Sequence, residues 1–276
     1  MEYPEVDFTH PDSIRNAVRE VEPAVIVNAA AYTAVDKAES ELELATAINA
    51  TGPGVLAEEA KRLGGLLVHY STDYVFDGSK QTPWVETDVP NPLNVYGRTK
   101  LAGDQAIQDS GCDHLIFRTS WVYGARGKNF LLTMLRLGKE RSELRIVDDQ
   151  IGSPTSSECI AQATSDVLAQ VLSPCGAGVE GRSGVYNLTS SGETSWFGFT
   201  KAILTEDAAR FGSLLPNLVP ILTADYPTPA KRPANSRLCC ERLEQTFGVT
   251  LPYWGDALSM VLDTLTEGSS LVSSKA

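Results

Sequence analysis

The stretch LLVHYSTD, residues 66–73, joins a short, continuous apolar run to a group of polar side chains. A run of this length without polar alternation is typical of a strand that is covered on both faces, as in a parallel sheet. Three further runs share this character, namely AVIVN at 24–28, HLIFR at 114–118 and VYNL at 185–188. The sequence therefore predicts four buried strands of one parallel sheet.

Helical patterns separate these runs. Residues 38–63, 96–109 and 156–172 are rich in Ala, Leu and Glu, with apolar side chains at helical spacing. Strands that alternate with helices predict an α/β fold with a doubly wound parallel sheet. The alternation is lost beyond Ser190, where a proline-rich segment at 226–233 must be extended or turning. We therefore expect a smaller lobe in that part of the chain.

The composition is that of an ordinary globular chain. Of the 276 residues, 42% are hydrophobic and 21% are charged, and no apolar run approaches the roughly 18 residues of a membrane helix. A net charge of -12 argues against a nucleic-acid surface, because phosphate binding needs clustered Lys and Arg. We expect a small-molecule ligand, with no membrane and no nucleic-acid partner.

The cysteines and histidines argue against a metal site. The five cysteines are odd in number and lack the paired spacing of metal ligands. The three histidines are scattered and form no HExxH pattern. No signal peptide is recognisable ahead of the first cysteine. These features predict a cytoplasmic protein that holds no metal.

The segment YGRTK, residues 96–100, places a phenol and an ammonium on one face of a predicted helix, because side chains four apart lie one turn apart. The pKa of a free Tyr is about 10. A neighbouring ammonium stabilises the phenolate, so we expect Lys100 to lower the pKa of Tyr96. The alternative is an exposed helix on which this pair is incidental.

The segment STDYVFDG, residues 71–78, follows directly on a predicted buried strand. Its hydroxyl groups are therefore expected at the carboxyl end of the sheet, where such folds bind ligands. The alternative is a polar strand end with a turn at Asp77 and Gly78. Together with Tyr96 and Lys100, a hydroxyl at this place suits carbonyl reduction, with a hydride from a nicotinamide and a proton from Tyr96.

Six segments in order along the chain resemble the dTDP-4-dehydrorhamnose reductase family. They are NAAAYTAVDKAE at 28–39, STDYVFDG at 71–78, PLNVYGRTKLAG at 92–103, RTSWVYG at 118–124, DDQIGSPT at 148–155 and YPTPAKRPANS at 226–236. The resemblance extends over residues 7–258. It implies an extended short-chain dehydrogenase with a Rossmann-like sheet, which uses NADPH or NADH to reduce the 4-keto group of a dTDP-sugar in nucleotide-sugar biosynthesis.

The resemblance also implies roles for individual residues. The positions that match the catalytic triad are Thr72, Tyr96 and Lys100. Those that match cofactor contacts are Asp7 and Phe8 beside the adenine, Ala31, Tyr32 and Thr33 beside the nicotinamide ribose and diphosphate, and again Tyr96 and Lys100. Those that match positions near the sugar are Thr72, Asp73, Tyr74 and Trp121.

We chose three further residues for the phosphate and base of the substrate from their chemistry. They are Asn129, Gln150 and Arg232, of which Arg232 offers bidentate geometry to a diphosphate in an otherwise acidic chain. Other interpretations remain open: Asn129 could cap a helix, and Trp121 could belong to the core.

The family resemblance divides the chain into two parts. Residues 1–125 and 156–190 are expected to form an incomplete NAD(P)-binding Rossmann-like domain, and residues 126–155 and 191–276 a substrate-binding lobe. The family's glycine-rich turn after its first strand has no counterpart, since the first glycine is Gly52. We therefore expect a sheet without its first strands, an apolar edge at residues 25–27 and weakened cofactor binding.

The missing glycine turn keeps a second function open. A regulatory subunit without catalysis, similar to the β subunit of methionine adenosyltransferase, resembles the same family. The segment RTSWVY at 118–123 favours the sugar reductases, because its Trp looks like theirs. The choice between NADPH and NADH stays open, as does the oligomeric state, for which a homodimer is one candidate.

Overall fold

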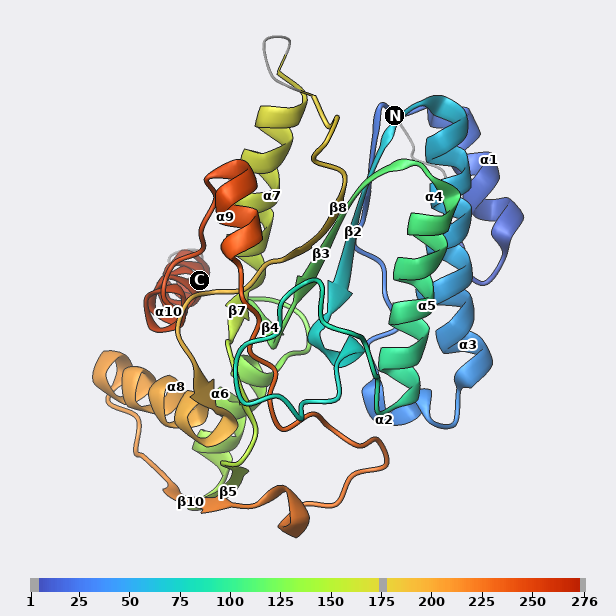
Figure 1. Ribbon diagram of the computed structural model, residues 1–276. Coiled ribbons are helices and arrows are strands. Elements are labelled where there is room, and N and C mark those ends of the chain that lie inside the picture. The colour runs from blue at the N-terminus through green and yellow to red at the C-terminus, as the bar shows by residue number, and fades with distance from the viewer. Residues whose placement is uncertain (1–4, 174–177, 274–276) are drawn as a thin grey trace.

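A parallel sheet of four strands forms the centre of the molecule (Figure 1). The computed structural model describes residues 5–173 and 178–273. The strand order is β1-β2-β3-β8, and the bounds are β1 Val25–Asn28, β2 Leu66–Thr72, β3 Asp113–Thr119 and β8 Gly184–Asn187. All three pairings are parallel. The four predicted strands and their parallel arrangement are therefore confirmed.

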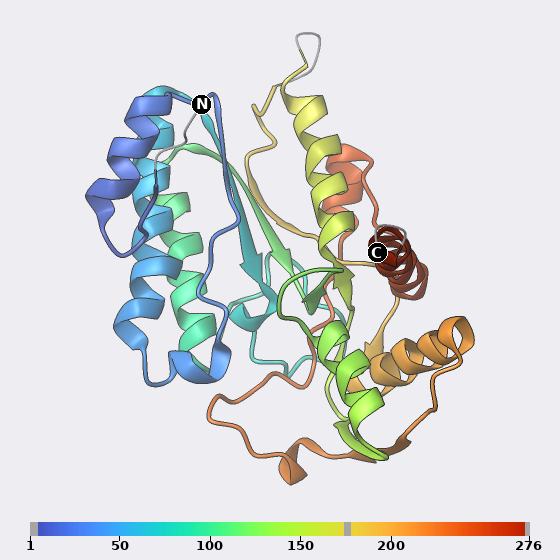
Figure 2. The same ribbon diagram turned by 180° about the vertical axis from the view of Figure 1, so that it is seen from behind.

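Helices cover both faces of this sheet, as Figures 1 and 2 show. On one face α1 (Pro11–Val21), α4 (Gly52–Leu63) and α5 (Val95–Ser110) pack on the side chains of Leu67 and Ile116. On the other face lie α7 (Ser157–Val171) and α9 (Glu241–Phe247). Because both faces are buried, the strands show continuous apolar runs instead of alternation. The predicted helix at 38–63 consists of several pieces, namely α2 Val35–Ala38, α3 Leu42–Thr46, the π-helical turn η1 Ala47–Thr51, and α4.

A second apolar core lies beside the sheet layer and contains Tyr123, Phe199 and Leu258. Its elements are α6 Phe130–Glu140, β5 Glu143–Val147, α8 Trp196–Phe211, β10 Asn217–Ile221 and α10 Trp254–Ser273. The last three show that the chain beyond Ser190 has more regular structure than its sequence pattern indicated. The predicted division into two domains stays a prediction.

Short elements connect the two cores. Strand β4 (Val122–Tyr123) pairs with β7 (Thr155–Ser156), and β6 (Ile151–Gly152) pairs with β9 (Thr194–Ser195). Two 3-10 turns complete the described elements, η2 at Asp73–Val75 and η3 at Thr223–Asp225.

Strand β1 is the edge of the sheet in the described part of the chain. Val27 is 48% exposed there, and Val25 and Ile26 are partly buried. The edge position predicted for this strand is therefore confirmed, whereas the predicted exposure holds for Val27 alone, because Val25 and Ile26 pack against the two cores beside the sheet. The loop that follows it, residues 29–34, contains no glycine.

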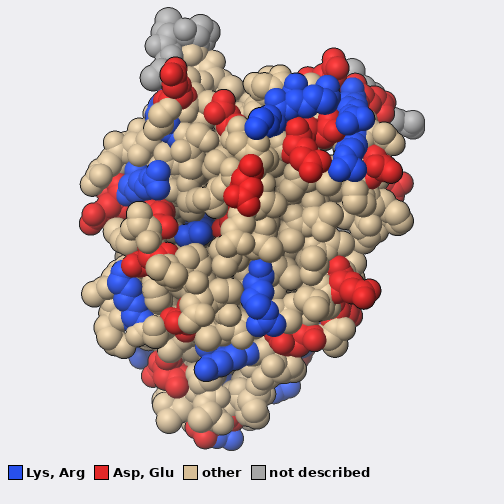
Figure 3. All heavy atoms as spheres, turned by 45° about the vertical axis from the view of Figure 1, so that its right-hand side comes forward, with Lys and Arg blue, Asp and Glu red and all other residues tan. Residues whose placement is uncertain are grey.

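The surface shown in Figure 3 carries acidic and basic side chains side by side, and the band of basic side chains at its upper right is bordered by acidic ones. Ion pairs join neighbouring elements, such as Arg19 of α1 with Glu59 of α4 at 2.7 Å. No helix of the described residues is long and apolar enough to cross a membrane. Within the same residues, no cluster of His, Cys, Asp and Glu side chains is placed to hold a metal ion.

Helix α5 approaches the backbone of its neighbours closely. A Cβ atom at Gly103 would lie 2.1 Å from the carbonyl oxygen of Asn49, and one at Gly97 would lie 2.2 Å from that of Tyr74. Such distances are far below van der Waals contact, so these two positions accept only glycine without movement of the helix.

We expect Gly103→Ala to lower the free energy of unfolding by about 1–3 kcal/mol through overpacking. The gain in helix propensity of about 1 kcal/mol offsets part of this loss. Urea denaturation followed by circular dichroism measures the change. Gln105→Ala, at an exposed position of the same helix, is the control and should leave the midpoint nearly unchanged; an unaltered midpoint in Gly103→Ala would contradict the packing argument.

Candidate active site

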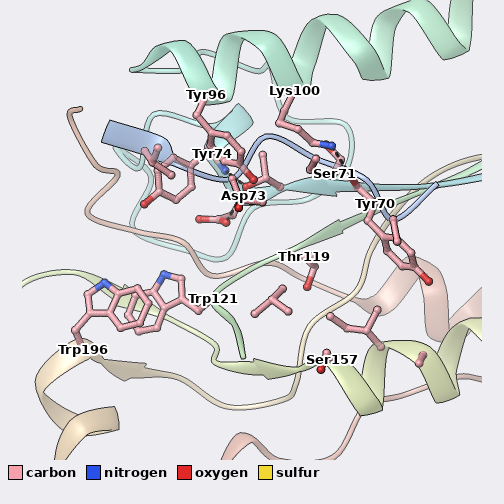
Figure 4. A pocket seen from close by; sticks show the side chains of 18 residues that line it. Tyr70, Ser71, Asp73, Tyr74, Tyr96, Lys100, Thr119, Trp121, Ser157 and Trp196 are labelled. Carbon is pink, nitrogen blue, oxygen red and sulfur yellow. Dashed lines mark hydrogen bonds between the residues drawn. The ribbon is translucent and has the colours of Figure 1, made fainter. Parts of the chain in front are cut away.

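A cavity of about 660 Å³ opens at the carboxyl ends of β2 and β3 (Figure 4). This is the place where the sequence predicted a ligand site. Eight of the predicted site residues line the cavity: Ala31, Thr33, Thr72, Asp73, Tyr74, Tyr96, Lys100 and Trp121. The segments that contribute them are the loop after β1, the end of β2 with η2, the first turns of α5 and the end of β3.

The first turn of α5 is held by Asn94. Its side-chain oxygen accepts a hydrogen bond from the backbone N–H of Gly97 at 2.8 Å, which caps the helix. Its side-chain amide donates to the carbonyl of Lys231 at 2.8 Å. Because Asn94 fixes the start of the helix, Tyr96 and Lys100 both project toward β2. This asparagine is a part of the site that our sequence analysis did not single out.

Tyr96 is partly buried, and its phenol lies beside Thr72 and Tyr74. Burial raises the pKa of the Tyr96 phenol to about 12, although a hydrogen bond with the Thr72 hydroxyl acts in the opposite direction. The rings of Tyr74 and Tyr96 meet edge to face, with centroids 5.5 Å apart. The phenol is therefore fully protonated at neutral pH and is held against the hydroxyl that was predicted to accompany it.

The Lys100 side chain turns toward the backbone of β2. Its Nζ donates to the carbonyl of Tyr70 at 2.6 Å and lies 3.1 Å from Nε2 of His69. Burial lowers the pKa of Lys100 to about 8, against the attraction of Asp104. The predicted lowering of the Tyr96 pKa by Lys100 is wrong for this structure, because desolvation of the phenol dominates and Lys100 is not among the groups that shift it.

Asp73 is a buried carboxyl group at the cavity wall. Burial raises its pKa to about 7, while hydrogen bonds from Ser236 and Thr72 act to lower it. Its Oδ2 atom has no hydrogen-bond partner among the described residues. At neutral pH this group is present both as an acid and as a carboxylate. It can thus donate to or accept from a hydroxyl group of a ligand.

Two stacked indole rings form the opposite wall of the cavity, facing Tyr74 and Tyr96 (Figure 4). The centroids of Trp121 and Trp196 are 3.6 Å apart, with an angle of 12° between the rings. Trp121 has a left-handed backbone, with φ of 48°, and its ring lies over Gly152, where a Cβ atom would come within 2.6 Å. Trp196 was missed in the sequence, because it is distant along the chain and belongs to no recognised motif.

The three residues chosen for phosphate and base do not line the cavity. Asn129 caps α6 by accepting from the N–H of Leu132 at 3.1 Å, so the helix-cap interpretation accounts for it. Gln150 is buried and donates to the hydroxyl of Thr223 at 3.0 Å. Arg232 pairs with Asp36 at 2.8 Å. The structure engages each of them with a partner inside the protein.

Three residues matched to the cofactor also lie outside the cavity lining. Asp7 is in the turn before α1, where bonds from Thr9 and His10 lower its pKa to about 2. Phe8 packs with the core between the sheet and α1. The hydroxyl of Tyr32 donates to Glu41.

The loop after β1 is fixed by Asn49, another residue that the sequence did not reveal. Its side-chain oxygen accepts from the N–H of Tyr32 at 2.8 Å, and its amide donates to the Tyr32 carbonyl at 3.1 Å. Asn49 also donates to the hydroxyl of Thr99 at 3.2 Å, which ties the loop to α5. The loop is thereby held as one wall of the cavity.

The donors and acceptors in the cavity fit the nicotinamide ribose of a dinucleotide. The phenol of Tyr96 and the amine of Lys100 can bind a ribose diol, and a cavity of about 660 Å³ lies within the usual range for small ligands. For the diphosphate, the loop after β1 offers no glycine-rich turn. The cavity residues therefore fit the nicotinamide ribose, and the loop after β1 does not supply a glycine-rich site for the diphosphate.

Comparisons with known proteins agree with this chemistry. The family described as "RmlD substrate binding domain" matches residues 1–267. A dTDP-4-dehydrorhamnose reductase of Burkholderia thailandensis is 50% identical over 267 residues, which are 95% of this chain and 89% of the relative. A reductase of the same name from Escherichia coli K12 is 47% identical over 263 residues, covering 94% and 85% of the two chains.

Solved structures show the same relationship. A dTDP-4-dehydrorhamnose reductase from Bacillus anthracis in complex with NADP superposes with a TM-score of 0.86 at 34% identity, covering 96% of this chain and 89% of that one. An orthologue from Clostridium acetobutylicum gives a TM-score of 0.84 at 37% identity, with coverage of 94% and 87%. The chain therefore belongs to the RmlD family, that of the dTDP-4-dehydrorhamnose reductases.

Proposed function

We propose that this chain carries the catalytic centre for the reduction of dTDP-4-dehydro-L-rhamnose to dTDP-L-rhamnose with NADPH or NADH. The observation that carries the proposal is that Thr72, Tyr96 and Lys100 line one cavity at the carboxyl end of β2. The similarity to a reductase in complex with NADP favours NADPH. The alternative of a regulatory subunit gains no support from the relatives described above, since they are named as reductases.

The chain's own residues supply the proton and hold the ketone. When bound, the dinucleotide supplies a hydride to C4 of the sugar. The Tyr96 phenol gives its proton to the carbonyl oxygen, which becomes the hydroxyl group. Thr72 donates a hydrogen bond to the oxygen on which negative charge develops, and after the transfer its hydroxyl stabilises the phenolate. Lys100, one helical turn away, lines the same cavity and can hold the ribose of the dinucleotide.

The remaining cavity residues are suited to holding the sugar. The free oxygen of Asp73 can bind a sugar hydroxyl, whether the group is protonated or ionised. The indole faces of Trp121 and Trp196 offer apolar area for a sugar ring or a pyrimidine.

We also infer a cytoplasmic enzyme, with support from the four described cysteines, which form no disulfide. The homodimer stays a prediction.

We expect Tyr96→Phe to reduce kcat by about 10²–10⁴-fold, because the proton donor is lost while the aromatic packing is kept. NADPH oxidation in the presence of dTDP-4-dehydro-L-rhamnose measures the rate, and circular dichroism checks the fold. Tyr253→Phe is the matched control, since Tyr253 is 48% exposed and does not line the cavity. Equal rates for the parent chain and Tyr96→Phe would refute the assignment.

The Asp73 carboxyl should make stability depend on pH. Its pKa in the folded state is about 7, above the ordinary value of 3.8. The protonated form is thus favoured by folding, and this contribution is complete below pH 4 and is lost as the pH rises through 7. In Asp73→Asn, the fall in the free energy of unfolding between pH 5 and pH 8 should be smaller. Urea titrations at both pH values test this; an identical fall in both proteins would show that the carboxyl is not desolvated.

A further inference from the structure

A row of buried polar side chains lies behind the cavity, between the end of β1 and α5. It consists of Asn28, His69 and Lys100, which are 3%, 0% and 1% exposed. The side-chain amide of Asn28 is 2.9 Å from Nδ1 of His69, and Nε2 of His69 is 3.1 Å from Nζ of Lys100. The proposed reaction assigns no role to Asn28 or His69. Their contact with Lys100 nevertheless determines which form of the amine this site can hold.

The orientation of Asn28 follows from its second contact. Its Oδ1 atom accepts a hydrogen bond from the backbone N–H of Ala30 at 3.1 Å. A rotated amide would turn its NH2 group toward this N–H, so that two donors would face each other. The NH2 group of Asn28 therefore points to His69 and donates to Nδ1. Since Nδ1 accepts, the proton of the neutral ring must be on Nε2.

The Nε2–H group of His69 then faces the amine of Lys100. An ammonium group has no lone pair and cannot accept from it. The contact is a hydrogen bond only if Lys100 is a neutral amine, which accepts from His69 and donates to the Tyr70 carbonyl at 2.6 Å. The pKa of His69 is far below its ordinary value because of burial and the charge of Lys100, so a charged imidazole is not an alternative.

The ammonium form of Lys100 requires the opposite arrangement. It would donate to Nε2 of His69, and the ring proton would then be on Nδ1. Asn28 would have to rotate and offer Oδ1 to the ring, which leaves the N–H of Ala30 facing an NH2 group. A donor that faces another donor loses its hydrogen bond, which disfavours this arrangement. The protonation of Lys100 is thus linked to the hydrogen bond of Ala30 in the loop after β1.

We propose that Asn28 and His69 are positioning residues that couple the protonation of Lys100 to the loop formed by residues 29–34, a wall of the cavity. A change of this loop that gives the Ala30 N–H another acceptor releases Asn28 to rotate. Asn28 and His69 then support the ammonium form of Lys100. The inference builds on the proposed function only in so far as that function gives Lys100 a role.

Other charged groups around α5 do not replace this effect. Asp104 on the same helix favours the ammonium form, and it is itself paired with Arg118 of β3 at 3.5 Å. On η2, Asp73 is held by Thr72 and Ser236. Groups on the remaining neighbours are paired elsewhere, namely Asp36 of α2 with Arg232 and Glu59 of α4 with Arg19 and Arg62. The burial that lowers the pKa of Lys100 to about 8 acts in the same direction as the His69 contact.

Nuclear magnetic resonance of the full chain without ligand tests the proposal directly. Above pH 8, where Lys100 is the neutral amine, nitrogen shifts of the imidazole should show the Nε2–H tautomer for His69, identified by its loss in His69→Gln. The exposed His10 serves as an internal reference. The Lys100 amine should titrate near pH 8. A His69 ring that carries its proton on Nδ1 above pH 8 in the parent chain would overturn the proposal.

Two substitutions test the coupling. In Asn28→Asp the carboxylate accepts from both Ala30 N–H and His69, which places the ring proton on Nδ1 and favours the ammonium. His69→Gln can offer a carbonyl oxygen to the ammonium without adding charge. Both should raise the Lys100 titration by about one pH unit, a tenfold change in the dissociation constant. If neither moves it, the coupling is absent.

This outcome is independent of the proposed reduction. The titration of Lys100 and the tautomer of His69 are read in the chain alone, whereas Tyr96→Phe tests the reaction with substrate. Activity with an unmoved Lys100 titration in both variants would refute the coupling and keep the reductase. A shifted titration without any NADPH oxidation would keep the coupling and refute the reductase.

Discussion

The close packing of α5 on the backbone of its neighbours is the constraint on which the rest of the site depends. Gly97 and Gly103 have no side chain, so the helix comes within contact of the carbonyl oxygens of Tyr74 and Asn49. Asn94 sets the point at which the helix begins. In this position α5 places the phenol of Tyr96 and the amine of Lys100 near the end of β2.

The same packing removes water and thereby controls the charges of the site. Burial raises the pKa of Tyr96 and of Asp73 and lowers that of Lys100, so all three shift toward their neutral forms. The reaction proposed for the site creates a phenolate on Tyr96, and the neighbouring Thr72 hydroxyl is then the group that stabilises the new charge. The row from Asn28 to Lys100 links the amine of Lys100 to the cavity wall.

Sequence reasoning succeeded where a feature depends on neighbours in the chain. The strands, the helix that begins near Tyr96 and the polar end of β2 were all predicted, and the family motifs brought Thr72, Tyr96 and Lys100 together. It was less informative about Trp196, Asn49 and His69, whose roles arise from contacts with distant segments. Residues chosen only for their side-chain chemistry, such as Arg232, turned out to have partners within the protein, in this case Asp36.

The sequence by itself determined the α/β class, the buried parallel strands and the set of groups available for reduction, because apolar periodicity and motif spacing are local properties of the chain. Only the tertiary structure decided the protonation states and the hydrogen-bond partners of these groups. The pKa of Tyr96 is raised by burial, and the amine of Lys100 faces β2 and His69 instead of shifting that phenol. Desolvation and hydrogen-bond partners depend on segments far apart in the chain, so no local pattern reports them.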